Sequence, residues 1–195
     1  MSIRWLCSLI AVLALATGCQ RYDVLVTKDQ VCQQKWGDVE AQLQRRSDLV
    51  PNLVATVRGS AKHEEETLEK VVQARAAATS ITLKAEDLED PAKMAAFSKA
   101  QDGLKGALSR LLVVQEQYPD LKANVAYHDL QIQLEGTENR ILRAREEYNA
   151  SVGDYNAELG HVSGAVVNRV TGRAFKPRAY FAASPGAAAA PTVSF

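Results

Sequence analysis

A repeat of residues in steps of four and three is the strongest constraint on how this chain folds. It keeps its phase over 26 positions, and its members are Cys32, Trp36, Val39, Leu43, Arg46, Val50, Leu53 and Val57. This spacing places every member on one side of an α-helix. The repeat therefore predicts one long amphipathic helix over about 23–58.

Pro51 lies inside this repeat. A proline removes one helical hydrogen bond and its ring clashes with the preceding turn, which usually bends a helix. Because the phase continues past the proline, we expect one helix that is kinked near Asp48. Two helices joined at 47–50 are the alternative.

Three more helices are predicted from the same kind of spacing. The second ends before AEDLEDP, the third begins at Asp90-Pro91, and the fourth follows Tyr118-Pro119 for about 40 residues, or about 60 Å. Four amphipathic helices with short connections predict an all-α fold, an antiparallel four-helix bundle over 20–160. Its first and last helices are long, and we expect their free ends to continue together as a stalk.

The first residues predict export. After Arg4, an apolar run of 12 residues from Trp5 to Ala16 is too short to span a bilayer, which takes about 20. It is typical of a signal peptide over 1–18. Small residues lead directly into Cys19, as in a bacterial lipobox. We expect lipid on Cys19 to anchor the chain to a membrane; a signal segment that is not cleaved is the alternative.

The charge pattern separates the end of the chain from its body. Without residues 1–18 there are 22 basic and 23 acidic residues, a balance that does not suggest nucleic acid as a partner. No acidic residue follows Glu158, whereas four basic residues do: Arg169, Arg173, Lys176 and Arg178. The basic amphipathic segment 161–183, with Tyr180 and Phe181, is expected either to contact an anionic membrane or a partner, or to dock on the bundle. Residues 184–195 are expected to be disordered.

Arg46 is the one charged member of the first repeat. A buried guanidinium needs acceptors, and the fourth predicted helix carries a polar strip beside its apolar side: Glu135, Asn139, Glu146, Asn149 and Asn156. We expect a structural polar network of Arg46 and Asp48 with Glu135, Asn139 and Glu146, which fixes how the helices pair. A ligand groove beside Pro51 is the alternative.

The sequence predicts neither a cofactor nor a catalytic site. Di-metal four-helix bundles need two Glu-x-x-His motifs, and only Glu158 and His161 form one. There is no P-loop, no GxSxG and no CxxC motif. Cys32 lies on an apolar face, where a buried and inert thiol is expected. No small-molecule substrate is indicated.

Three blocks of sequence resemble the LemA family in order and spacing. They are WGDVEAQLQRRSDLVPNLVATVRGSAKHEEETL at 36–68, YPDLKAN at 118–124 and LEGTENRILRAREEYNASVGDYN at 134–156. The resemblance implies a LemA-like helical bundle on the outer side of a membrane and implies no catalytic residues. Members commonly have an N-terminal transmembrane helix, where this chain has the lipobox-like Cys19.

The expected function combines these observations. We expect a lipoprotein of the bacterial cell envelope that is not an enzyme and that acts as a scaffold, a membrane-organising protein or a binder of an unidentified envelope protein. An enzyme of unrecognised type, or a carrier of a small ligand or metal, is the alternative.

Overall fold

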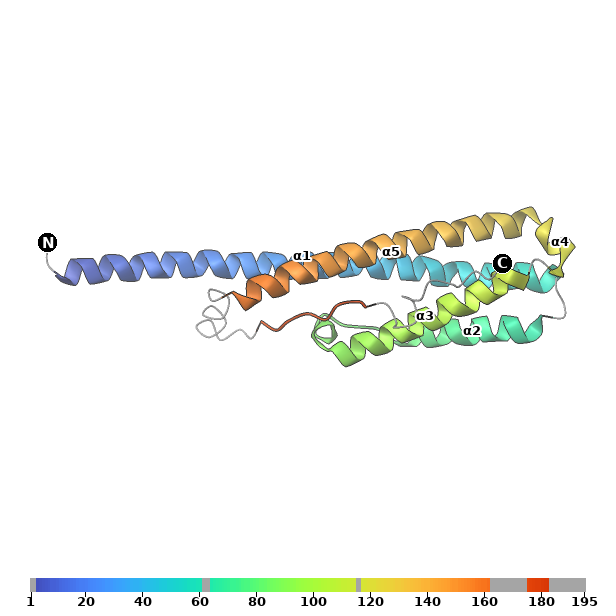
Figure 1. Ribbon diagram of the computed structural model, residues 1–195, viewed down its shortest axis with the longest axis horizontal. Coiled ribbons are helices and arrows are strands. Elements are labelled where there is room, and N and C mark those ends of the chain that lie inside the picture. Colours follow the sequence, from blue (N-terminus) through green and yellow to red (C-terminus); the bar gives the residue numbers. More distant parts are fainter. Residues whose placement is uncertain (1–2, 61–63, 115–116, 162–174, 183–195) are drawn as a thin grey trace, which may run out of the picture.

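The computed structural model describes residues 3–60, 64–114, 117–161 and 175–182, with side chains from Tyr22 onward except that of Ser60. The predicted all-α fold is confirmed (Figure 1). Its elements are the helices α1 (Ile3–Ser60), α2 (Glu65–Ser80), α3 (Pro91–Val114), α4 (Pro119–Lys122) and α5 (Val125–Gly160), and the 3₁₀ turn η1 (Asp87–Glu89).

Two long helices and one short hairpin form the bundle. Helix α1 has 58 residues and α5 has 36, and the two lie antiparallel side by side (Figure 1). Helices α2 and α3, with 16 and 24 residues, pack against each other at the end of the bundle that is far from residue 3. The first and last helices are therefore the long ones, as predicted, and α1 is about 87 Å long.

Helix α1 runs without a break through Pro51, so the two-helix alternative was wrong. Apolar packing explains why the helix tolerates the proline, because the whole of the predicted repeat from Cys32 to Val57 is buried. In proteins, helices gain most of their stability from such a packed face. Every member contributes to the core except Arg46, which is also buried.

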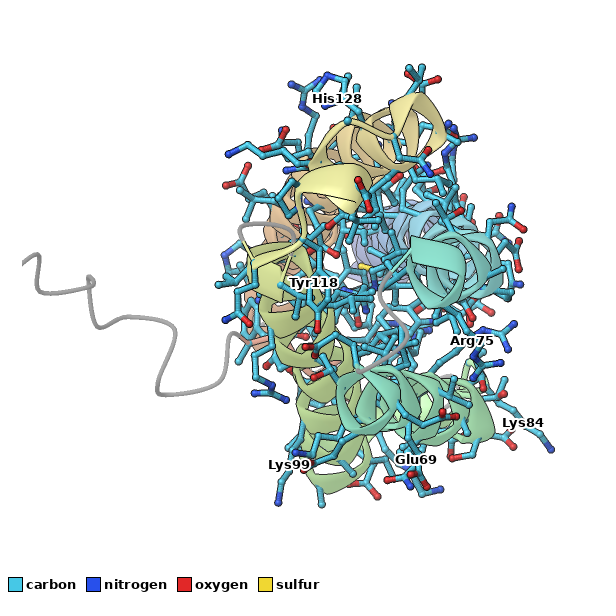
Figure 2. All side chains as sticks on the ribbon, turned by 90° about the vertical axis from the view of Figure 1, so that its right-hand side faces the viewer. Glu69, Arg75, Lys84, Lys99, Tyr118 and His128 are labelled. Carbon is cyan, nitrogen blue, oxygen red and sulfur yellow. The ribbon has the colours of Figure 1, made fainter. Side chains whose placement is uncertain are left out.

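The interior consists of two apolar clusters that meet at Arg46. One holds the head of the bundle, where Val50 and Leu53 of α1 pack with α2, α3, α4 and the first part of α5. The other holds the stalk, where Trp36 and Leu43 pack with the rest of α5, with η1 and with residues 175–182. Polar and charged side chains such as Glu69, Lys99 and His128 lie on the outside (Figure 2).

Capping residues explain where the shorter helices begin. Asp90 accepts hydrogen bonds from the N–H groups of Ala92 and Lys93, and proline follows it at the first helical position. Asn124 caps α5 by accepting from the N–H of Tyr127. Among the helices of the described ranges, none has both the length and the apolar character that crossing a membrane requires.

Candidate functional site

Residues 175–182, which we call the C-terminal strap, lie along the stalk beside α5 and α1 (Figure 1). They form neither helix nor strand. Side chains that face the bundle alternate unevenly with exposed ones: Phe175, Arg178, Ala179 and Phe181 are buried, whereas Lys176, Pro177, Tyr180 and Ala182 are exposed. The strap therefore closes one side of the stalk core.

Two asparagines of α5 hold the main chain of the strap. Asn156 accepts a hydrogen bond from the N–H of Arg178 at 2.9 Å and donates one to the carbonyl of Arg178 at 2.9 Å. Asn149 makes the same pair of bonds with Phe181, at 2.8 and 3.1 Å. A side-chain amide has one donor and one acceptor end, so each asparagine pairs with both the N–H and the carbonyl of one strap residue.

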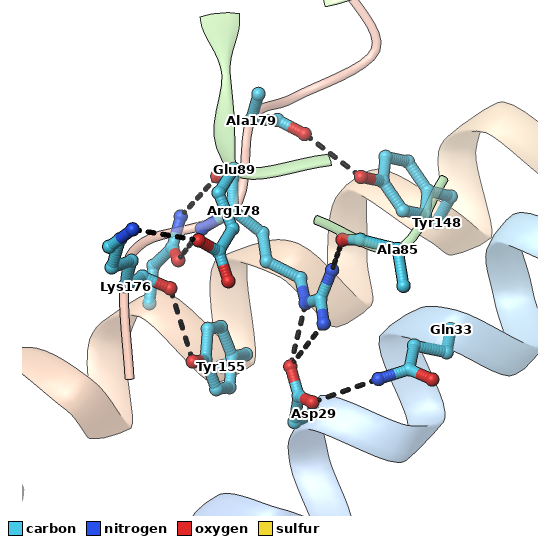
Figure 3. A network of polar contacts seen from close by, with 10 residues as sticks. Asp29, Gln33, Ala85, Glu89, Tyr148, Tyr155, Lys176, Arg178 and Ala179 are labelled. Atoms are coloured by element: carbon cyan, nitrogen blue, oxygen red, sulfur yellow. Dashed lines mark hydrogen bonds and ion pairs between the residues drawn. The ribbon is translucent and has the colours of Figure 1, made fainter. Parts of the chain in front are cut away.

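Two tyrosines that precede these asparagines repeat the pattern. Tyr155 donates its hydroxyl to the carbonyl of Lys176 at 3.1 Å, and Tyr148 donates to that of Ala179 at 3.0 Å (Figure 3). The hydroxyls must stay protonated to donate, and burial favours this state because it raises the pKa of Tyr155 to about 12 and raises that of Tyr148 further.

Arg178 is the charged anchor of the strap. Its guanidinium donates to Asp29 of α1, with Nε at 2.7 Å and Nη2 at 2.6 Å from Oδ1, and to the carbonyl of Ala85 at 3.1 Å (Figure 3). Its side chain is 4% exposed and that of Asp29 is 17% exposed. A pair this well buried has little water to exchange with, so removing one partner leaves the other charge uncompensated.

Aromatic side chains anchor the two ends of the strap. Phe181 packs on Trp36 of α1 and on Phe97 of α3, with ring centroids 6.0 and 5.8 Å apart. The guanidinium of Arg145 covers its ring at 4.6 Å. At the other end, Phe175 meets the ring of Tyr22 edge-on at 5.8 Å. Separate aromatic contacts thus fix the two ends of the strap.

The docked strap corrects part of the membrane-contact prediction. Arg178 and Phe181 are buried against the bundle and are not available to a membrane surface, whereas Lys176 and Tyr180 are exposed. Docking on the bundle, the alternative, is what residues 175–182 do. Arg169 and Arg173, and the tail 184–195, lie outside the described residues.

Arg46 forms the second polar cluster, between the two apolar ones. Its guanidinium donates to Glu138 Oε1 of α5 at 2.9 Å and to Gln101 Oε1 of α3 at 2.6 Å. Gln101 in turn donates to the carbonyl of Ala78 at the end of α2, at 3.0 Å. Arg46 thereby connects α1 to α5 and α3 directly and to α2 through Gln101, and a helix that slid along the bundle would break these bonds.

The partners predicted for Arg46 were wrong. Asp48, Glu135, Asn139 and Glu146 are all exposed, and Asp48 accepts its hydrogen bond from Gln44 on the same helix. The carboxylate that binds Arg46 is Glu138, which lies three residues after Glu135 and next to Asn139 on α5. Asn149 and Asn156 of the same strip hold the strap instead.

Arg75 of α2 satisfies the group that Pro51 leaves unpaired. In a helix the carbonyl of Ser47 would accept from the N–H of residue 51, and proline has none. The Nε of Arg75 donates to that carbonyl at 2.9 Å and to the hydroxyl of Ser47 at 3.2 Å. Pro51 therefore leaves a carbonyl of α1 free to accept the hydrogen bond from Arg75, and this bond connects α2 to α1.

Three hollows in the described part of the chain are small or open. Two of ≈160 and ≈120 Å³ flank Gln101, and both are smaller than the usual 300–1,000 Å³ of a ligand pocket. One of ≈420 Å³ lies between α1 and α5, where Lys35 and Glu147 pair across it at 2.6 Å. In the described part of the chain, no three His, Cys, Asp or Glu side chains are placed to hold a metal ion.

Comparison with known proteins decides the family. The profile of the LemA family matches residues 35–195. The chain belongs to the LemA family. It is 30% identical over 196 aligned residues to magnetosome protein MamQ 2 and to MamQ 1 of Paramagnetospirillum magneticum, covering 91% of this chain and 71% of each relative. It is 28% identical to protein LemA of Metamycoplasma hominis, over 62% of this chain and 51% of that one.

The LemA match covers the Arg46 cluster and the strap cluster except for Asp29, which precedes the matched residues. The block at 36–68 contains Arg46 and Pro51, and the block at 134–156 contains Glu138 and both Tyr-Asn pairs that hold the strap. The family match also extends over the strap. The sequence carries a signal for the residues that hold the strap, since Tyr-Asn recurs after seven residues at 148 and 155. Nothing in the sequence indicated which segment would bind to them.

Proposed function

We propose that this LemA family protein is a lipoprotein of the bacterial cell envelope that is not an enzyme and that presents a helical head to a protein partner. The lipobox-like sequence at Cys19 and the family membership support the anchor. The similarity to magnetosome proteins and to a protein LemA favours a place in a membrane-associated bacterial structure.

The length of α1 is the observation that carries the proposal. From Cys19 to Ser60 it covers about 60 Å, and α2 and α3 pack at its far end. A lipid on Cys19 would hold the near end at the membrane, so the head would lie well beyond the lipid headgroups. Such a rod is suited to reaching a partner.

The interior favours binding over catalysis. The deeply buried cation of Arg46 pairs with Glu138 of α5, and that of Arg178 pairs with Asp29 of α1. Perturbed groups that converge on a pocket are the usual mark of an active site. Here the buried tyrosines with raised pKa values, Tyr148 and Tyr155, use their hydroxyls to bind main-chain carbonyls of the strap.

Changing Cys19 to Ser tests the anchor. The mature wild-type protein should carry acyl chains on Cys19 and sediment with membranes, and Cys19→Ser should lose both properties. Cys7→Ser is the matched control, because it removes another cysteine of the predicted export segment and should leave both unchanged. Mass analysis that finds unmodified Cys19 in the mature protein would reject the anchor.

Capture from membranes tests the role as a binder. Detergent extracts of cells with tagged wild-type chain should give a protein that co-purifies in fixed ratio, and Cys19→Ser should reduce its yield because the chain no longer resides at the membrane. If no protein co-purifies in fixed ratio under chemical cross-linking, the binding role is rejected.

A further inference from the structure

We propose that the side chains and carbonyls that hold the strap form a peptide-binding site, and that the strap of a second copy of this chain occupies it by exchange. We call it the strap site; it consists of Asp29, Tyr148, Asn149, Tyr155 and Asn156 with the carbonyls of Ala85 and Leu88. The inference goes beyond the proposed function, because it names a partner and does not depend on the lipid anchor.

The strap site binds mainly the main-chain groups of the strap, as a peptide-binding site does. Apart from the asparagine and tyrosine contacts, the N–H of Ala179 donates to the carbonyl of Leu88 at 2.7 Å, and Ser98 donates to the carbonyl of Ala182 at 2.8 Å. Main-chain hydrogen bonds supply affinity and pockets for alternate side chains supply specificity wherever proteins bind extended peptides. Here the selected features are two aromatic residues with an arginine midway between them.

None of these contacts requires the strap to come from the same chain. Residues 162–174 connect α5 to the strap, and these 13 residues span at most about 45 Å when extended. A helix with its side chains is about 10–12 Å across, so a neighbouring stalk lies within reach. Exchange of an identical element between copies repeats every contact at little cost, which makes it an accessible route to a dimer.

Asp29 and Arg178 make the choice of occupant testable. They form an ion pair between α1 and the strap, and both side chains are largely buried. Reversing one charge should expel the chain's own strap. Reversing the other charge in a second chain should create a strap and a site that fit only each other.

The experiment co-expresses full-length Asp29→Lys and Arg178→Glu chains with different tags. Each own strap then faces a like charge, whereas both exchanged straps face an opposite charge. We expect a one-to-one heterodimer that survives capture on both tags in sequence, and at least a tenfold lower yield of dimer when either variant is expressed alone. The control pair, Asp23→Lys with Arg178→Glu, changes an exposed aspartate of the same helix and should give no such enrichment.

Cross-linking of the wild-type chain keeps the test valid even if the variants fold poorly. Lys176 of the strap lies 3.5 Å from Glu89 of η1, with the two side chains 65% and 29% exposed. A carbodiimide joins such an amine and carboxylate directly. With exchange, a product of twice the mass of one chain should form and should contain the Lys176–Glu89 linkage, and Lys176→Gln should abolish that linkage. Exclusively intrachain linkage, together with no heterodimer from the charge-reversed pair, would overturn the proposal.

Discussion

The link between Arg75 and Pro51 makes a quantitative prediction about coupling. Arg75→Met keeps an unbranched apolar stem but removes the donor to the carbonyl of Ser47, a residue that is 3% exposed. A buried carbonyl without a partner costs about 1–3 kcal/mol. With Pro51 in place, Arg75→Met should therefore lower the free energy of unfolding by about this amount.

Pro51→Ala changes that outcome. Alanine restores an N–H that can donate to the carbonyl of Ser47 within the helix, and it removes the clash of the proline ring with the preceding turn. In the Pro51→Ala background, the loss of the Arg75 guanidinium no longer leaves the carbonyl unpaired. The double-mutant cycle should therefore give a coupling of about 1 kcal/mol or more, well above the 0.3–0.5 kcal/mol scatter of independent sites.

Urea unfolding followed by circular dichroism at 222 nm measures all four corners of the cycle. For a chain of this length 1 kcal/mol corresponds to a change of about 2–4 °C in Tm, so thermal scans give a second reading. Arg110→Met is the matched control, since Arg110 is exposed on α3, and its cycle with Pro51→Ala should be additive. Additive effects of Arg75→Met and Pro51→Ala would refute the replacement of the helical hydrogen bond.

Three further results follow from the polar contacts. Arg46→Ala should lower the free energy of unfolding by about 3–5 kcal/mol, because it leaves Glu138 without its buried cation, and Arg46→Leu should cost less; equal urea midpoints for wild type and Arg46→Ala would contradict this. Unfolded tyrosine ionises near pH 10, while burial raises the pKa of Tyr155 to about 12, so its contribution to stability is complete below pH 10 and is lost as pH rises towards 12. Between pH 8 and pH 11 the free energy of unfolding should therefore fall less for Tyr155→Phe than for the wild-type protein. Burial raises the pKa of the Cys32 thiol, so maleimide at pH 8 should label it only after unfolding, and rapid labelling of folded protein would show that α1 and α5 separate there.

The sequence predicted the helices well because their causes are local. The repeat from Cys32 to Val57 is a property of one segment, and each of its residues is buried. Asp90 and Pro91 likewise start α3 through contacts within a few residues. The partner of Arg46 could not be predicted in the same way, because choosing Glu138 over Glu135 depends on the rotation of α5 against α1.

The strap shows the same division between local and tertiary causes. Its composition of basic and aromatic residues fits a membrane surface and a protein surface equally well. What decides between them lies 22 and 149 positions away in the sequence, at Asn156 and Asp29, which bind the main chain and the guanidinium of Arg178. Only the fold brings these groups together.

The register of the strap follows from two repeats that match in length. Seven residues of α-helix rise about 10.5 Å, the distance from one Tyr-Asn pair to the next, and three extended residues cover about 10 Å. Tyr155 and Asn156 accordingly bind at Lys176 and Arg178, and Tyr148 and Asn149 bind at Ala179 and Phe181.

One of the two possible one-residue shifts of the strap is blocked at a single position. It would bring Pro177 to the place of Arg178, where Asn156 requires an N–H that proline lacks and Asp29 would have no cation. Both losses occur together in a largely buried site, so the shifted alignment is much less stable than the native one. Pro177 is itself exposed and makes no hydrogen bond through its nitrogen, and its contribution is to exclude this alternative. The same restriction applies to a strap arriving from a second copy.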